Sequence, residues 1–391
     1  MRQKVLRFSL LFLLIPFCNG CKFFEKNYER IIHADGTEEV NKNTTIEPLI
    51  SDGEEISILP SEWMDFKNNA TNPADVDNYF VQDLEISRPE PVTIKWTNKK
   101  MTGQYKFLLS TNKDMSDSNI YELEQEYIQL KDLFAGTRYY YQIRAEYSNY
   151  YVISKLFNFK TVDFFRTIQI SGVYNARDFG NKKTNNGKQR VKQGLVYRTA
   201  NFDGITSNGK AQAIERYGIK TDLDLREKIP TESPIGPNIK YINNGVGTYG
   251  SPHYVSYDHG INVAEYQVAM RDNLKVFADE NNFPLAFHCA VGRDRTGTLA
   301  ITLYLLLGIN LEEIRYDYAV SFFSKVCNNY TYSDFEQTVE GLFKYFDRYK
   351  GDGLSDKANI YERAEAYCLH VGLSKEEIAS IRNNLLEDIK K

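Results

Sequence analysis

The residues best suited to covalent chemistry lie in one short stretch, FHCAVGRDRTG at positions 287–297. Within it, Cys289 and Arg295 are six positions apart. A thiolate and a guanidinium at this spacing can face one tetrahedral anion only if the intervening backbone curls around it with its N–H groups turned inward, as in an anion-binding nest. Cys289 would attack phosphorus to form a phosphocysteine that water later hydrolyses. Arg295 would bind two phosphoryl oxygens and stabilise their charge in the transition state.

The other residues of this stretch would support the reaction, which calls for no metal and no cofactor. Gly292 allows a close approach of the backbone that a side chain would obstruct. Thr296 could donate its hydroxyl to the sulfur and so make the thiolate a better leaving group. His288 is expected to order the loop rather than to transfer protons. The loop residues expected to bind the substrate phosphate are Ala290, Val291, Gly292 and Arg293.

The leaving oxygen of a phosphoester needs a proton, and two aspartates are candidates for the general acid. Asp294, inside the loop, is the first candidate, and its alternative role is to pair with a neighbouring arginine and shape the loop. Asp258 is the second, because it lies in a glycine-, tyrosine- and asparagine-rich stretch at 243–262 that has the composition of a long lid. Asp224 and Arg226 are expected to form a structural ion pair at a strand end, from which Arg226 could reach the site.

The segments around the loop predict how it is positioned. Residues 283–288 form a short apolar run suited to a buried strand, and residues 296–309 form an apolar stretch of helical length. The loop would therefore sit at a helix N-terminus, where the helix dipole favours both a bound phosphate and an ionised Cys289. Strand-like and helical segments alternate around it, which predicts an α/β domain with a largely parallel sheet and the loop at the carboxyl end of a central strand. Ser374 and Glu377 predict a capping box for the last helix.

From about Phe165 to the C-terminus, the chain resembles the bacterial tyrosine phosphatase family that carries an HCxxGKDRTG signature. Arg198 stands where that family has an arginine, whereas Arg293 replaces the usual lysine of the loop, which keeps the charge but changes its geometry. The resemblance implies a cysteine-dependent protein-tyrosine phosphatase, and it implies that Asp294 is the general acid, as in some members. The segments that carry the resemblance, besides the loop, are NARDFG at 175–180, GLVYRTANFDGIT at 194–206, YGIKTDLDLRE at 217–227 and AEAYCLHVGLSKEEIASIRNNLL at 364–386.

Three other functions are compatible with parts of this pattern. The first is a phosphatase for phosphoinositides or soluble inositol phosphates, which would differ from a phosphotyrosine phosphatase in the depth of its pocket. The second is a sulfur transferase, which Arg295 and Thr296 argue against. The third is a non-catalytic cell-surface binding protein, which would have no need of Cys289, Arg295 and Thr296 together.

The N-terminus predicts export. Basic residues precede an apolar run at 8–17, followed by small and polar residues up to Cys21, which predicts a signal peptide at 1–20. CNGC at 18–21 resembles a bacterial lipoprotein cleavage site, so Cys21 is the expected lipid attachment site, and the membrane is an expected partner. The alternative is a secreted or periplasmic protein. The net charge of −4 gives no reason to expect nucleic-acid binding.

Between the signal and the phosphatase-like region, two further segments are expected. Residues 21–82 are polar and predict a tether and lead-in. Residues 83–162 contain runs that alternate apolar and polar residues, which predicts a small all-β sandwich. LKDLFAGTRYYYQIRAEY, at 130–147, resembles a strand region of fibronectin type III modules. The remaining residues, 163–391, would form the α/β phosphatase domain.

Overall fold

The computed structural model describes residues 28–100, 102–227, 230–245, 261, 263–351 and 353–389. The chain divides into two compact units, each built from two separate stretches. The first unit combines the residues up to Ile58 with Glu90–Asp163, and the second combines Leu59–Pro89 with Phe164–Lys391. The expected signal peptide and Cys21 lie outside the described residues. Within the described ranges, no helix is both long and apolar enough to cross a membrane.

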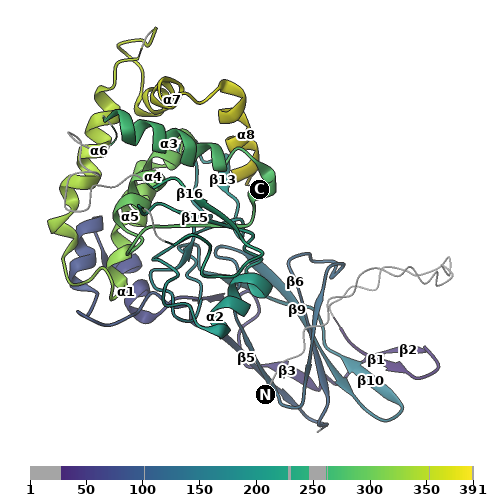
Figure 1. Cartoon of the computed structure of the whole chain (residues 1–391). Helices are drawn as coiled ribbons and strands as arrows, with labels where there is room; N and C mark the ends of the chain where they lie inside the picture. The colour runs from purple at the N-terminus through teal and green to yellow at the C-terminus, as the bar shows by residue number, and fades with distance from the viewer. Residues whose placement is uncertain are drawn as a thin grey trace. The chain divides into compact units, whose positions relative to one another are not determined.

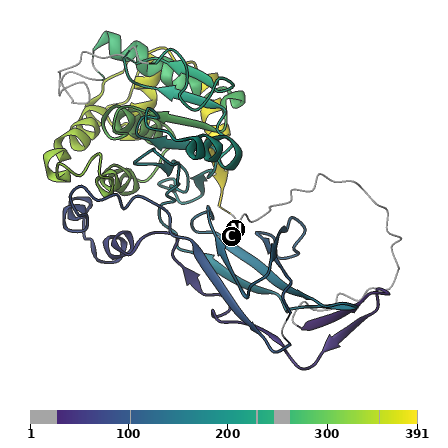
Figure 2. The ribbon, with the colours of Figure 1, turned by 60° about the horizontal axis from the view of Figure 1, so that its bottom comes forward.

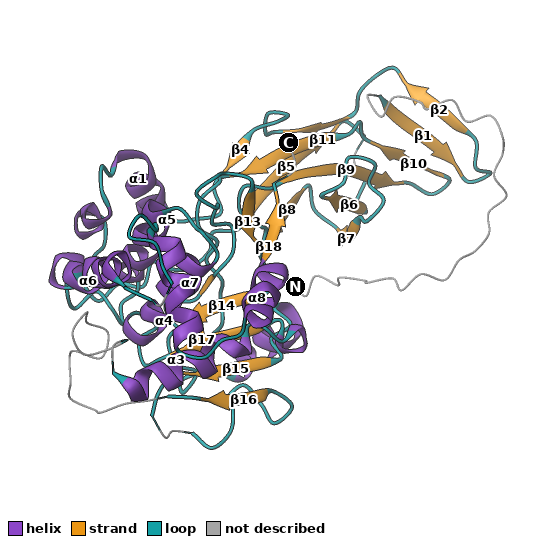
Figure 3. Cartoon of the chain, turned by 90° about the horizontal axis from the view of Figure 1, so that it is seen from above, coloured by secondary structure: helices purple, strands orange, loops and turns teal. Residues whose placement is uncertain are grey.

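The first unit consists of strands, which Figure 3 shows in orange. Its buried aromatic residues stack on one another, with ring centroids 6.0 Å apart for Trp96 and Phe107 and 5.2 Å apart for Phe107 and Tyr141. The larger sheet has eight strands, namely β1 (Glu29–His33), β2 (Glu38–Asn41), β4 (Glu55–Ile56), β6 (Tyr105–Ser110), β7 (Asn119–Leu123), β9 (Arg138–Glu146), β10 (Tyr150–Ile153) and β11 (Phe157–Thr161). The smaller sheet has three, β3 (Ile46–Pro48), β5 (Val92–Asn98) and β8 (Tyr127–Leu130).

The first half of the expected tether is folded, which corrects the expectation for residues 29–58. β1 pairs with β10 over four residues, and β4 pairs with β11. The buried Glu29 carboxylate accepts hydrogen bonds from the backbone N–H groups of Thr45 and Ile46, both at 2.9 Å. These strands are short and mostly polar, so the chain lacks the apolar alternation that would have revealed them. The alternating runs further along do form strands, while the resemblance to fibronectin type III modules stays a prediction.

Residues 59–89, called the strap below, belong to the second unit. They contain α1 (Ser61–Asn69) and a 3₁₀ turn, η1 (Pro73–Asn78). Trp63 is fully buried, stacks on Phe323 with ring centroids 4.6 Å apart, and donates to the Ile86 carbonyl at 2.8 Å. Figures 1 and 2 show the strap in dark blue beside the green helices of this unit. The expected boundary between residues 82 and 83 therefore falls inside a segment that packs as one piece.

The second unit is built around a five-stranded sheet with helices, as the α/β expectation requires. The strand order is β12 (Arg177–Asp178), β14 (Val196–Thr199), β17 (Leu285–His288), β15 (Thr221–Asp224) and β16 (Lys240–Asn243). All neighbours pair in parallel except β12 with β14. Every residue of β14, β15 and β17 is buried. β17 is the central strand, so whatever follows its carboxyl end lies at the middle of the sheet edge.

The helix that follows β17 forms the core of the second unit. α4 (Asp294–Leu306) is buried from Thr296 to Leu306. Gly297 is required there because a Cβ at this position would lie 2.8 Å from the Tyr318 ring. The other helices that follow the strap are α2 (Ser207–Ala211), α3 (Ala264–Val276), α5 (Leu311–Ala319), α6 (Glu336–Arg348), α7 (Ile360–His370) and α8 (Lys375–Leu385). A separate pair of strands joins β13 (Gln189–Val191) to β18 (Leu386–Asp388). The capping box at the start of α8 is confirmed.

Candidate active site

The loop of residues 289–293 connects the end of β17 to the start of α4, as the sequence predicts. Gly292 has a φ of +72°, a left-handed conformation that favours glycine. A Cβ at Gly292 would lie 2.3 Å from the carbonyl oxygen of Thr199, at the end of β14. The loop therefore passes so close to the neighbouring strand that only glycine fits there.

The carbonyl groups of the loop are turned toward side chains on one side, which we call the β14 side. The three hydrogen bonds are Asn201 Nδ2 to Ala290 O at 2.7 Å, Asn175 Nδ2 to Val291 O at 2.9 Å and Arg198 Nη2 to Gly292 O at 2.9 Å. In a planar trans peptide the C=O and N–H groups point in opposite directions. The N–H groups of residues 291–293 are therefore directed away from these side chains, which is the arrangement of an anion nest.

Cys289 lies at the start of this loop and is buried. Burial raises the pKa of its thiol, but the charge of Arg295 and the nearby hydroxyl and backbone N–H of Thr296 outweigh that effect, even against the nearby Asp294 carboxylate. The net result is a pKa below the usual value of a cysteine thiol. A buried thiol that still favours its ionised form is suited to nucleophilic attack.

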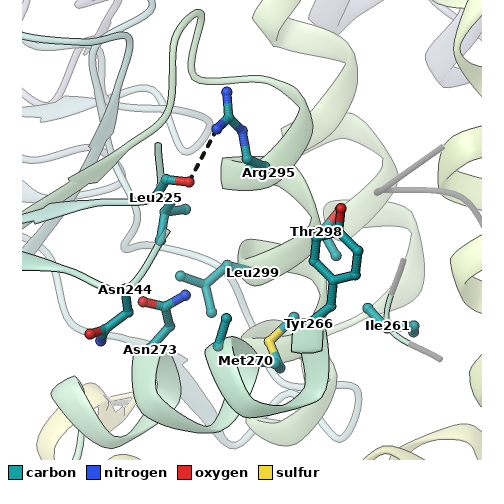
Figure 4. Close-up of a pocket in the computed structure, with 10 residues that line it drawn as sticks. Leu225, Asn244, Ile261, Tyr266, Met270, Asn273, Arg295, Thr298 and Leu299 are labelled. Carbon is teal, nitrogen blue, oxygen red and sulfur yellow. Dashed lines mark hydrogen bonds between the residues drawn. The ribbon is translucent and has the colours of Figure 1, made fainter. Parts of the chain in front are cut away.

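Arg295, in the first turn of α4, lies toward the other neighbour of β17, which we call the β15 side. Its Nη1 donates to the carbonyl of Leu225 at 3.3 Å, a bond drawn in Figure 4. Leu225 follows β15, and its N–H donates to the His288 carbonyl at 2.8 Å. The guanidinium thus lies at the end of the strand beside the nucleophile, where it lowers the pKa of Cys289.

His288 contacts the loop backbone, in line with the ordering role expected for it. Its Nε2 lies 2.9 Å from an Asp222 carboxylate oxygen, and its Nδ1 lies 3.1 Å from the Cys289 carbonyl oxygen. Burial lowers the pKa of the imidazole, but the Asp222 and Asp224 carboxylates and the Cys289 carbonyl together raise it more, so the net shift is upward. An imidazole fixed between the Asp222 carboxylate and the Cys289 carbonyl is suited to holding the loop rather than to shuttling protons.

The expected ion pair of Asp224 and Arg226 is confirmed. Arg226 Nη2 lies 2.8 Å from Asp224, and its Nη1 lies 2.7 Å from Asp203. Asp224 is fully buried and also accepts from the Tyr241 hydroxyl at 3.1 Å. With both carboxylates bound, the Arg226 guanidinium is committed to this structural cluster.

Arg293 contributes differently from what its place in the loop suggests. Its guanidinium lies 3.7 Å from the centroid of the Phe335 ring and donates to Asp294 at 2.9 Å and to the Cys327 carbonyl at 3.4 Å. The side chain is 7% exposed. The expected substrate contact of Arg293 is therefore available to its backbone N–H, while the guanidinium is engaged in protein contacts.

The structure describes the first candidate for the general acid and not the second. The Asp294 side chain is 17% exposed, and Oδ1 also lies 3.5 Å from the Tyr318 hydroxyl. It is the first residue of α4 and adjoins Arg295. Asp258 lies outside the described residues, as does most of the stretch expected to form a lid.

Buried charges that sequence reasoning did not assign support the β14 side. The Asp317 carboxylate forms ion pairs with Arg198, with Arg177 at 3.4 Å and with Lys182 at 3.4 Å, and all four side chains are at most 5% exposed. Burial raises the pKa of Asp317, but the three cations lower it far more. Burial and the neighbouring Arg198 lower the pKa of Arg177 to about 10. Two of these residues lie in the segments of the family resemblance, Arg177 in NARDFG and Arg198 in VYRTAN, but the resemblance does not predict their pairing with Asp317.

The comparisons with known proteins agree with this geometry. A sequence model described as the tyrosine phosphatase family matches residues 168–387, more than half of the chain. The chain belongs to the tyrosine phosphatase family. The segments of the tyrosine phosphatase resemblance, from NARDFG to the capping box of α8, all lie inside the matched residues.

Individual relatives are more distant. A Cupriavidus necator protein named "Putative tyrosine-protein phosphatase" is 26% identical over 170 residues, which cover 38% of this chain and 60% of that protein's length. The chain thus spans less than two thirds of this relative. Two solved structures are similar in part. The Siw14 catalytic core has 17% identity and a TM-score of 0.29, and the match covers 38% of this chain and 82% of that one. The core catalytic domain of the PP-IP phosphatase SIW14 from S. cerevisiae, in complex with citrate, has 20% identity and a TM-score of 0.26, and the match covers 34% of this chain and 77% of that one.

Proposed function

We propose that this protein is a cysteine-dependent phosphatase that hydrolyses phosphotyrosine in proteins through a phosphocysteine intermediate. One observation carries the proposal: Cys289 has a lowered thiol pKa although it is buried, at the start of a loop whose carbonyls face away from the phosphate position. Membership of the tyrosine phosphatase family supports the choice of phosphotyrosine.

The reaction has two steps. The Cys289 thiolate attacks phosphorus, the P–O bond to the tyrosine breaks, and Asp294 donates a proton to the leaving oxygen. Water then attacks the phosphocysteine, the S–P bond breaks, Asp294 takes the proton from the water, and phosphate leaves. Arg295 and the inward N–H groups bind the phosphoryl oxygens in both transition states. Thr296 stabilises the thiolate when it is the leaving group of the second step.

The substrate class is tested by hydrolysis of a phosphotyrosine peptide, a phosphoserine peptide, a phosphoinositide and an inositol polyphosphate. The enzyme is the chain from residue 22 onward, in the presence of reductant and chelator, with Cys289→Ser as the control. We expect the phosphotyrosine peptide to be hydrolysed fastest and the variant to show no turnover. If the inositol compounds were hydrolysed faster, they would replace phosphotyrosine as the proposed substrate. Turnover by Cys289→Ser would contradict the role of Cys289 as the nucleophile.

The role of Asp294 is tested by the leaving group. A general acid matters most when the leaving oxygen is a strong base, so Asp294→Asn should slow phenyl phosphate far more than 4-nitrophenyl phosphate. If all leaving groups slowed equally, Asp294 would shape the loop through Arg293 instead. Asp272→Asn, on the exposed side of α3, is the matched control and should change neither rate.

We also propose that the mature protein is anchored in the bacterial cell envelope through a lipid on Cys21, since CNGC at 18–21 spans the end of the expected signal peptide. Mass spectrometry of the protein from its native membrane should find an N-terminal lipidated cysteine at position 21. An unmodified N-terminus after residue 20, or beyond it, would indicate a secreted or periplasmic protein.

A further inference from the structure

A pocket opens on the β15 side of the loop, between α3 and α4. It is open to solvent on one side and leaves about 450 Å³ free of protein atoms, the open part included. Figure 4 shows Asn273, Met270 and Tyr266 from α3 with Leu299 and Thr298 from α4, and the bond between Arg295 and Leu225 at one end. The remaining lining residues are Asn244, Ile261 and Ala269.

Two buried polar atoms in the wall of this pocket have no hydrogen-bond partner among the described residues. They are Oδ1 of Asn273, a residue that is 8% exposed, and the hydroxyl of Thr298, which is 6% exposed. Leaving a buried polar atom unpaired is unfavourable, because it has lost its hydrogen bonds to water without replacing them. On the β14 side the loop carbonyls accept from Asn175, Asn201 and Arg198. The unpaired Asn273 and Thr298 atoms on the β15 side therefore point to a ligand that would pair with them.

The pocket is connected to the expected phosphate position through two residues. Arg295 lines the pocket and acts electrostatically on the Cys289 sulfur. Leu225 also lines it and is hydrogen-bonded to His288, next to the nucleophile. A group in the pocket would therefore lie beside a phosphoryl group bound at Cys289, close enough to belong to the same substrate.

The lining restricts what that group can be. Most of the wall is apolar, which disfavours a sugar or an inositol ring, because their many hydroxyls would be left unpaired. Among the described residues that line the pocket, Arg295 is the one that carries a charge, so a cationic group is disfavoured too. The Asn273 carbonyl oxygen calls for a hydrogen-bond donor, which a fully ionised second phosphate does not supply. An aromatic ring with a single N–H or O–H donor satisfies Asn273 and packs on Met270, Leu299 and Tyr266.

We propose that this pocket is a specificity subsite that takes a tryptophan or tyrosine side chain located near the phosphotyrosine of a protein substrate. The inference rests on the proposed function, because it assigns the part of the substrate that lies beyond the phosphoryl group. Asn273 accepts the hydrogen bond of the aromatic N–H or O–H, and the apolar wall binds the ring.

The test compares phosphotyrosine peptides that carry tryptophan, phenylalanine or alanine at each position flanking the phosphotyrosine. At the best position, we expect kcat/KM to be about tenfold higher with tryptophan than with alanine, and phenylalanine to be intermediate because it lacks the donor. Asn273→Leu keeps the size and removes the acceptor. It should abolish the difference between tryptophan and phenylalanine and preserve the preference for phenylalanine over alanine.

Gln267→Leu is the matched control, because Gln267 lies on the same helix but does not line the pocket. This variant should retain the full tryptophan preference, and thermal unfolding of both variants checks that the fold is intact. Equal kcat/KM for the three peptides at every position would overturn the subsite, as would an Asn273→Leu enzyme that still distinguishes tryptophan from phenylalanine. Hydrolysis of the alanine peptide would in either case preserve the proposed function, whereas no hydrolysis of any peptide would overturn both.

Discussion

The two sides of the catalytic loop are built in opposite ways. On the β14 side, side chains donate a hydrogen bond to every loop carbonyl from residue 290 to 292, and a buried cluster of charges lies behind them. On the β15 side, Arg295 donates to the Leu225 carbonyl, and a pocket in which two polar atoms of the described residues are unpaired lies next to it. The first arrangement fixes the shape of the loop, whereas the second retains the capacity to bind.

Among changes to the β14 side, we expect the largest loss of stability from disruption of the buried charge cluster around Asp317. Asp317→Asn leaves three buried cations without their carboxylate, and breaking a buried ion pair costs about 3–5 kcal/mol. Urea unfolding at pH 7 measures the loss. Since the pKa of Asp317 is lowered in the folded protein, its contribution is present above the unfolded-state pKa and is lost as the pH falls toward the folded one. The difference between wild type and variant should therefore shrink in acid.

Glu312→Gln is the control for this prediction, because Glu312 lies on the same helix, α5, with its side chain 64% exposed. It should change the free energy of unfolding by less than about 0.5 kcal/mol. A loss below about 1 kcal/mol for Asp317→Asn would mean that the cluster relaxes easily, and the contrast between the two sides would weaken.

The next largest effect, a loss of catalytic rate, is expected from disruption of the contact between the loop and β14. Gly292→Ala places a Cβ against the Thr199 carbonyl at 2.3 Å and strains a φ of +72°. The loop must shift, and misplacement of about 1 Å can cost about 100-fold in rate. We expect kcat/KM for a phosphotyrosine peptide to fall by about that factor, or about 2.7 kcal/mol. Gly308→Ala is the control, because Gly308 also has a positive φ but a Cβ there would meet no atom within 4 Å, so the rate should be preserved. If both variants lost the same activity, the loss would come from backbone strain at a positive φ and not from the contact with Thr199.

The sequence predicted the centre of the site and missed what surrounds it. The strand, loop and helix around Cys289 could be read because their signals are local: an apolar run, a glycine and an apolar helix. The strap could not, because Asn328 bonds the carbonyls of Val81 and Leu84 across about 245 residues of chain. No periodic pattern in the strap reveals such partners.

The same limit applies to single side chains at the loop. Asn175 and Asn201 lie in segments that were recognised, yet an asparagine in a loop ordinarily suggests a turn. Their role depends on which carbonyls the fold brings near them. The pocket is a still clearer case, since Asn273 is distinguished only by the partner that its carbonyl oxygen lacks in the described structure.

The pH profile tests the electrostatics of the nucleophile itself. Activity requires the thiolate, so kcat/KM should rise with pH through the pKa of Cys289, with a midpoint below the usual 9.0. Burial raises that pKa, and Arg295 and Thr296 lower it. Thr296→Ala should therefore move the acid limb to higher pH, and Thr296→Ser should restore it. The pH dependence of iodoacetamide alkylation provides an independent measurement, and an unmoved midpoint would remove Thr296 from the set of residues that stabilise the thiolate.

The smallest effect is expected from Arg293, which separates the role of its side chain from that of its backbone. Arg293→Lys keeps the charge but loses the planar contact with Phe335, so unfolding should become easier by about 0.5–1 kcal/mol. The rate should change by less than about threefold, because the guanidinium points into protein contacts rather than to phosphate. Arg295→Lys, two residues on, should lower kcat by about 100-fold or more, since a bidentate contact in the transition state is lost. If the two variants lost similar activity, the Arg293 side chain would have to reach the phosphate during turnover, and the β14 side would be less fixed than its hydrogen bonds indicate.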